Sequence, residues 1–184
     1  MKQDISKLYI ITGGPGAGKT TLLNELNKYG LSTVPEEGRR IITEQVESGG
    51  EALPWLNKEL FANLMFEESV KTYLEMDHVT HMKPVFFDRG IWDTLGYMRL
   101  ENIPVPELLI TKAREMVYNN NVFILPPWKE IYENDRERKQ TIEKAILTFE
   151  CMKEIYQEFG FNIIEVPKVT IEKRASFILD RVLT

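Results

Sequence analysis

The stretch "ITGGPGAGKTTLLNEL", residues 11–26, decides how the rest of the chain is interpreted. Four glycines and a proline fall between residues 13 and 18, directly after an apolar run and before leucines at helical spacing. A regular strand or helix disfavours so many glycines, because each one loses much backbone entropy and adds no side chain to pack. The stretch therefore predicts a tight loop between a buried strand and a helix.

The loop follows the pattern G-x-x-x-x-G-K-[ST], with Gly13 and Gly18 followed by Lys19 and Thr20. Such a loop curls so that successive N–H groups point at phosphate oxygens, and the following helix adds partial positive charge at its N-terminus. The lysine reaches the β- and γ-phosphates and the threonine hydroxyl ligates Mg²⁺. A chance match in a glycine-rich turn is the alternative, but the strand-loop-helix context favours a site for Mg·ATP. The expected nucleotide-binding residues are Gly13, Gly14, Pro15, Gly16, Ala17, Gly18, Lys19, Thr20 and Thr21.

Length and composition narrow the class of protein. The chain has 184 residues, and we expect one P-loop domain over residues 1–184. A net charge of −5 without a local basic stripe speaks against nucleic-acid binding. The single cysteine, Cys151, excludes an internal disulfide framework and fits a reducing compartment. The apolar run at residues 8–11 is too short for a signal core or a membrane span, so we expect a cytoplasmic protein.

Short apolar runs alternate with helix-like segments along the chain, which predicts an α/β fold with a mainly parallel sheet covered by helices on both faces. The two longest helices each carry an apolar stripe that is predicted to face the core. The stripes consist of Leu60, Phe61, Leu64 and Met65 in the first helix, and of Ile142, Ala145, Ile146, Phe149, Met152, Tyr156 and Phe159 in the second. The expected strands are residues 5–11, 31–35, 84–88, 121–125 and 161–166, and the expected helices are residues 19–29, 36–47, 57–76, 91–101, 106–118, 141–159 and a last helix from residue 171.

Charged residues follow the second and third expected strands. Asp88 ends the run "VFFD", where P-loop proteins place a second carboxylate near Mg²⁺, although it could instead cap the next helix. Arg89 beside it could clamp a substrate or a phosphoryl group, because a planar guanidinium suits oxyanions. Glu36 follows the second strand and could face an acceptor hydroxyl, since ligands bind at the carboxyl ends of parallel strands.

Two neighbouring pairs leave a choice open. Of Glu36 and Glu37, one is expected to serve only as a charge partner of the first helical turn. Of Arg39 and Arg40, at least one is expected to be a surface side chain. The candidate substrate contacts are Glu36, Arg39, Arg89 and Asp93, and the candidate metal ligands are Thr20 and Asp88.

A charge run, "NDRERKQ" at residues 134–140, lies between the fourth strand and the long helix at 141–159. Such runs often form a solvated surface. A mobile lid at this position could instead bring Arg136 or Arg138 onto the transferring phosphate. The candidate catalytic residues are therefore Lys19, Glu36, Asp88, Arg89, Arg136 and Arg138.

Other residues with possible chemistry are expected to be structural. His78 and His81 have no third ligand nearby and are interpreted as surface histidines. Cys151 is expected to be a small buried side chain. Trp55 and Trp128 are interpreted as core or rim aromatics, although Trp128 could touch nucleotide or substrate.

The segments "GGPGAGKT", "VPEEGRR", "VFFDRG", "ILPPWKEIYENDRERKQ" and "EVPKVTIEKRASFIL", in this order, resemble the AAA-domain ATPase/kinase family over nearly the whole chain. Its members are similar to the kinase domain of the bifunctional nicotinamide-nucleotide regulator and, more distantly, to deoxynucleoside and nucleoside monophosphate kinases. The resemblance implies a five-stranded sheet of order 2-3-1-4-5.

The same resemblance implies roles for particular residues. It places Glu36 where deoxynucleoside kinases carry a catalytic acid, and Asp88 with Arg89 at their acid-arginine pair, although Gly90 replaces the usual serine. Arg136 and Arg138 fall at the lid. Residues 167–169 lie where the adenine is held.

Size and strand order favour a small-molecule kinase that moves the γ-phosphate of Mg·ATP to a nucleoside-like or other small metabolite. The alternative is a regulatory ATPase or nucleotide switch that binds a partner or a lipid head group. A guanine-specific switch would carry N-K-x-D late in the chain, whereas "NKEL" at residues 57–60 ends in leucine and precedes the third strand. This counts against a GTPase but not against an ATP switch, and kinase-like toxins and degenerate nucleotide binders stay open.

Overall fold

The computed structural model describes residues 6–78, 81–131 and 141–183. Its strands form one sheet in the order β2-β3-β1-β4-β5, and all neighbouring strands are parallel. The strands are β1 (Leu8–Gly13), β2 (Ser32–Val34), β3 (Val85–Asp88), β4 (Asn121–Leu125) and β5 (Asn162–Glu165). The predicted fold class and strand order are therefore confirmed.

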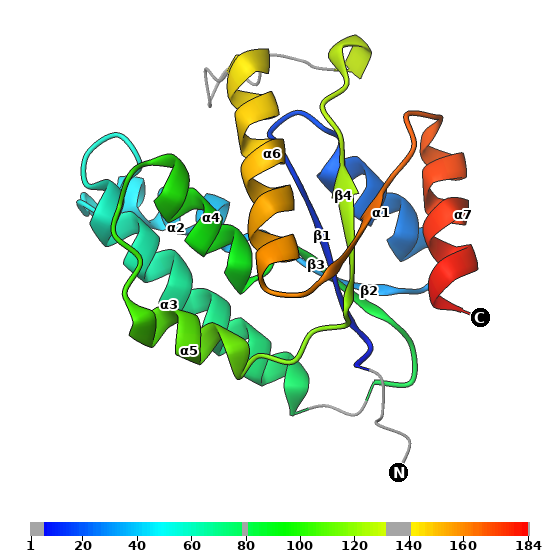
Figure 1. Cartoon of the computed structure of the whole chain (residues 1–184), viewed down its shortest axis with the longest axis horizontal. Coiled ribbons are helices and arrows are strands. Elements are labelled where there is room, and N and C mark those ends of the chain that lie inside the picture. The colour runs from blue at the N-terminus through cyan, green and yellow to red at the C-terminus, as the bar shows by residue number, and fades with distance from the viewer. Residues whose placement is uncertain (1–5, 79–80, 132–140, 184) are drawn as a thin grey trace.

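Helices cover both faces of the sheet, with α3, α4 and α5 on the left of Figure 1 and α1 and α7 on the right. Their bounds are α1 (Lys19–Lys28), α2 (Glu37–Ser48), α3 (Lys58–Asp77), α4 (Ile91–Leu100), α5 (Glu107–Arg114), α6 (Ile142–Glu158) and α7 (Ile171–Val182), with a short 3-10 helix, η1 (Lys129–Ile131), after β4.

A hydrophobic core lies on each face of the sheet, and the side chains of consecutive β1 residues point into different cores. Ile10 packs with residues of α3, α4, α5 and α6, whereas Ile11 packs with residues of α1 and α7. This follows from the two-residue repeat of a strand, which sends successive side chains to opposite faces. Burial on both faces explains why β1 and β4 are apolar throughout rather than alternating.

Several details differ from the sequence-based expectations. Residue 5 of the strand expected at 5–11 lies outside the described residues, and β1 runs from Leu8 into the glycine loop as far as Gly13. The helix expected at 106–118 is shorter and ends at Arg114. Two members of the expected stripes, Leu60 and Ile146, are 44% and 45% exposed and so lie outside the core. Their neighbours Phe61 and Ala145 are buried, as the stripes predicted.

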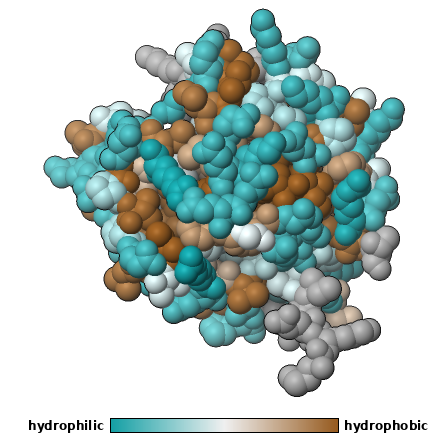
Figure 2. Space-filling model, viewed as in Figure 1, coloured by the Kyte–Doolittle hydropathy of each residue, from teal (hydrophilic) through white to brown (hydrophobic). Residues whose placement is uncertain are grey.

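Exposed hydrophobic side chains are scattered over the molecule. In the view of Figure 2, hydrophobic residues reach the surface in separate patches between hydrophilic ones. Trp55 is 65% exposed, so it is a rim aromatic and not part of the core. Within the described ranges, no helix combines the length and the apolar composition needed to cross a bilayer.

Candidate active site

The glycine loop connects the end of β1 to the start of α1 at the carboxyl edge of the sheet. Gly18 has a φ of 87°, in the left-handed region that favours glycine. A Cβ atom at Gly14 would lie 2.4 Å from the carbonyl oxygen of Ala145 in α6, so only glycine allows this approach. No described side chain caps the first N–H groups of α1. These groups are available to an anion, as expected of a phosphate-binding loop.

Lys19 is buried inside this loop. Its Nζ donates to the carbonyl oxygens of Gly13, at 3.1 Å, and Gly14, at 2.9 Å. Burial, with a smaller contribution from the nearby charge of Arg89, lowers the pKa of Lys19 from 10.5 to about 8. The ammonium is therefore held within the loop in an environment that disfavours its charge.

Asp88 ends β3, directly beside Ile11 of β1 in the sheet register. It is buried, and its Oδ1 has no hydrogen-bond partner among the described residues. Burial raises the pKa of Asp88, while the charge of Lys19 opposes that rise. Asp88 does not cap α4, because the N-cap of that helix is Gly90 and the side chain of Asp93 accepts the Gly90 N–H, at 2.9 Å. A buried, unpartnered carboxylate oxygen beside the loop suits a cation or its water shell.

Arg89 adopts a left-handed backbone conformation, with φ of 72°. Such a conformation costs a non-glycine residue about 1–3 kcal/mol and persists where the surroundings enforce it. Here the Arg89 N–H donates to the carbonyl of Ile11 at 3.0 Å. The guanidinium donates to Glu36, at 3.1 Å, and to Asp93, at 3.2 Å. Burial disfavours the charge, but the surrounding carboxylates outweigh it and raise the pKa of Arg89.

Asp93 joins several parts of the site. One oxygen accepts from the hydroxyl of Thr12 as well as from Arg89, and the other accepts from the Gly90 N–H and from the Tyr156 hydroxyl, at 2.6 Å. Its position therefore fixes Arg89 relative to β1 and α6. Direct contact of Asp93 with a substrate stays a prediction.

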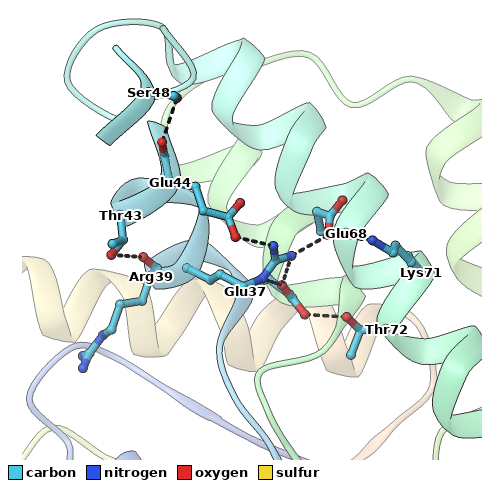
Figure 3. Close-up of polar contacts among 9 residues, drawn as sticks. Glu37, Arg39, Thr43, Glu44, Ser48, Glu68, Lys71 and Thr72 are labelled. Atoms are coloured by element: carbon cyan, nitrogen blue, oxygen red, sulfur yellow. Dashed lines mark hydrogen bonds and ion pairs between the residues drawn. The ribbon is translucent and has the colours of Figure 1, made fainter. Parts of the chain in front are cut away.

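Figure 3 shows the polar contacts that connect Glu37 and its neighbours on α2 to Glu68 and Thr72 on α3. Arg40 forms ion pairs with Glu37, Glu44 and Glu68, tying α2 to α3. The other oxygen of Glu37 accepts from the hydroxyl of Thr72. Glu37 and Arg40 are thus engaged with each other and with α3. Glu36 turns to Arg89 instead.

Arg39 differs from its neighbour Arg40. Its side chain points away from the network in Figure 3, and it forms no ion pair with any residue in the described part of the chain. Arg39 lines a pocket that also contains Glu36, Asp88 and Arg89. The candidate substrate contacts, which come from separate segments of the chain, therefore line one pocket in the structure.

This pocket has a volume of about 970 Å³, within the range of small-molecule sites. It begins at the glycine loop, where Pro15 lines it, and extends between α2, α3, α4 and α6. Its apolar wall includes Phe61, Met65 and Tyr97. The Tyr97 hydroxyl has no hydrogen-bond partner in the described residues. A ligand in this pocket would meet aromatic and aliphatic surface and a charged end.

Known proteins with similar sequences and structures agree with this geometry. Residues 8–174 match the family described as AAA domain. The chain belongs to this family. The predicted family is therefore confirmed.

One curated relative of this AAA domain is the thymidylate kinase of Prochlorococcus marinus (strain NATL1A), 29% identical over 161 residues that represent 75% of each chain. Deoxyadenosine kinase from M. mycoides, solved with products dCMP and dCDP, has a TM-score of 0.68 at 17% identity and covers 96% of this chain and 98% of its own. NadR protein, solved in complex with NR, has a TM-score of 0.72 at 18% identity and covers 98% of this chain and 52% of its own. These structures share the nucleoside-kinase P-loop fold.

The remaining candidates of this AAA domain fall into two groups. Arg136 and Arg138, with the proposed lid at 134–140, lie outside the described residues. His81 lies 2.7 Å from the carbonyl of Met76, and the described residues hold no cluster of three metal-ligating side chains. The histidines therefore keep their structural interpretation.

Sequence reasoning missed Thr12, Tyr156 and Arg174 as parts of the site. Thr12 is a buried polar residue at the end of an apolar strand, which is a usable signal. Tyr156 was assigned to the apolar stripe of its helix, and nothing local indicates that its hydroxyl meets Asp93. Arg174 carries no local signal, because its contacts lie more than 40 residues away in the chain.

Proposed function

We propose that this chain is an ATP- and Mg²⁺-dependent kinase, one domain over residues 1–184, that transfers the γ-phosphate of ATP to a small nucleoside-like metabolite. One observation carries the proposal: the pocket that holds Glu36, Arg39 and Arg89 opens directly onto the phosphate-binding loop and Asp88. A phosphate donor and an acceptor could thus meet at the same sheet edge, which positions them for direct transfer.

The proposed roles follow the position of each group. Lys19 and the N–H groups of the loop hold the polyphosphate. Thr20 and Asp88 would hold Mg²⁺, which in such sites neutralises phosphate charge, and the lack of a dedicated cage in the described residues fits a metal bound largely through phosphates. Glu36 accepts the proton of the acceptor hydroxyl. Arg136 and Arg138 would act from the lid.

Arg89 and Glu36 form the proposed acceptor end of the site. Their 3.1 Å ion pair leaves little net charge, which suits a neutral hydroxyl better than a free phosphate. Arg39, with no carboxylate partner in the described residues, would be available if the acceptor carries an anionic group. The aromatic wall with Phe61 and Tyr97 suits a flat ring such as a base.

A pocket of this kind favours a kinase over a regulatory switch. A switch needs the phosphate loop and a surface that changes with the nucleotide, but it has no use for a cavity of about 970 Å³ beside the γ-phosphate position. We also propose a cytoplasmic location, supported by the free thiol of Cys151.

The test is turnover of Mg·ATP with and without a library of nucleosides, nucleoside monophosphates and related metabolites. ADP release that depends on one acceptor, together with a product heavier by one phosphoryl group in the mass spectrum, would support the kinase. Acceptor-independent ADP release with no phosphorylated product from any compound would contradict it and favour an ATPase.

A further inference from the structure

Arg174 is a buried cation with no counter-ion among the described residues. Its residue surface is 2% exposed, and it lies in the first turn of α7. The guanidinium makes one hydrogen bond, from Nη1 to the carbonyl oxygen of Ala17 at 3.2 Å, and its Nε has no partner among the described residues. No carboxylate in the described ranges forms an ion pair with it.

Only an aromatic ring and a carbonyl oxygen compensate the charge of Arg174. Its Cζ lies 4.7 Å from the centre of the Trp128 ring. Cation–π contact and a single hydrogen bond to a neutral oxygen replace only part of the hydration that a guanidinium loses on burial. In agreement, burial lowers the pKa of Arg174. Two more exposed arginines, Arg40 and Arg99, are instead paired with carboxylates, as Arg99 is with Glu158.

The position of Arg174 indicates where a counter-ion could come from. Its partner Ala17 belongs to the glycine loop, and a Cβ atom at Gly18 would lie 3.2 Å from its Nη1. The guanidinium therefore lies against the backbone of the same loop whose N–H groups are proposed to bind phosphate. Charges separated by one layer of backbone interact strongly inside a protein, because little water screens them.

We propose that Arg174 is a positioning residue for the nucleotide polyphosphate, whose negative charge supplies the counter-ion that Arg174 lacks among the described residues. This rests on the proposed function, since it requires that the loop binds a nucleotide. Arg174 does not touch the phosphates. It acts through the Ala17 carbonyl and through its charge, so nucleotide binding and the docking of α7 on the loop stabilise each other.

Two substitutions separate charge from packing. Arg174→Met keeps an unbranched side chain of similar length but removes the charge, whereas Arg174→Lys keeps the charge and loses the planar guanidinium. The matched control is Arg181→Met on the same helix. Arg181 also stacks on an aromatic ring, that of Phe177, and donates to a carbonyl, but it is exposed and has no described contact with the glycine loop.

The measurements are the dissociation constants of Mg·ATP and of inorganic tripolyphosphate by calorimetry, and the melting temperature of each nucleotide-free protein. We expect Arg174→Met to weaken both ligands by about tenfold, within the usual range of coupling between sites, without lowering the melting temperature. Removing a buried charge with no counter-ion is neutral or stabilising when an apolar side chain fills its place. Arg174→Lys should bind within about threefold of the parent, and Arg181→Met should match the parent.

Two results would overturn the inference. One is parent-like binding of both ligands by Arg174→Met, which would leave the proposed kinase function intact and reduce Arg174 to packing. The other is equal loss of affinity in Arg174→Lys and Arg174→Met, because that would make the guanidinium's shape, and not its charge, responsible. Failure of the parent itself to bind Mg·ATP would instead contradict the proposed function, and the inference with it.

Discussion

Replacing Lys19 by methionine tests whether the buried charge of Lys19 destabilises the folded protein when no phosphate is bound. The pKa of Lys19 falls from 10.5 to about 8 on folding. At about 1.4 kcal/mol for each pH unit, this difference corresponds to roughly 3 kcal/mol. Since the pKa is lower in the folded protein, the unfolded chain binds more protons between pH 8 and 10.5. The stability of the parent should therefore rise with pH in this window relative to Lys19→Met.

The assay is urea unfolding of the parent and of Lys19→Met at pH 7, 8, 9 and 10, without nucleotide. Loss of the hydrogen bonds to Gly13 and Gly14 shifts all values of the variant alike, so only the change with pH reports the titration. We expect the free energy of unfolding of the parent, minus that of Lys19→Met, to rise by up to about 3 kcal/mol toward pH 10. Lys168→Met, which removes an exposed lysine, is the matched control.

Nucleotide binding should respond to pH in the opposite direction. ATP requires the ammonium form of Lys19, so the affinity of the parent for Mg·ATP should fall above about pH 8, by up to about tenfold for each pH unit. A stability difference that is constant from pH 7 to 10, combined with a pH-independent affinity, would refute the electrostatic description of the loop.

Three further substitutions test the roles assigned in the pocket. Glu36→Gln should spare Mg·ATP binding and reduce phosphate transfer to an identified acceptor by roughly 10²–10⁴-fold, whereas the control Glu37→Gln should retain transfer. Full transfer by Glu36→Gln in a steady-state assay would exclude Glu36 as the base. Asp88→Asn should raise the Mg²⁺ concentration needed for half-maximal turnover, and an unchanged Mg²⁺ titration would contradict its assignment. The double variant Arg136→Ala, Arg138→Ala should lower kcat more than ATP affinity, and parent-like kcat would return residues 134–140 to a solvated surface.

Local sequence patterns predicted the fold class and the glycine-loop part of the candidate site. The loop from Gly13 to Thr20 is identifiable because all its chemistry lies within eight consecutive residues. The apolar runs of β1 and β4 indicated buried parallel strands for a similar reason, since burial on both faces leaves a continuous signature. Strand order, in contrast, came from the family resemblance, because several orders satisfy the same alternation.

The parts that the sequence could not predict are pairings between distant segments. Glu36 and Arg89 are 53 residues apart, and only the folded sheet shows that the glutamate turns to the arginine while Glu37 turns to Arg40. Asp93 is a second example, because its oxygens accept from donors such as Thr12, which lies 81 residues away. Its direct contact with a substrate stays a prediction.

The site contains buried charges of both signs. Lys19 and Arg174 both donate to carbonyl oxygens of the glycine loop, and burial disfavours the charge of each. Asp88, at the adjoining strand end, is an acid whose charge burial also disfavours. Polyphosphate would compensate the two cations, and a divalent cation would compensate the acid, so only the pair satisfies all three groups together. Under the proposed function, part of the free energy of folding is held in groups that would reach their preferred state only with ligand bound, and this would favour Mg·ATP over either ATP or Mg²⁺ alone.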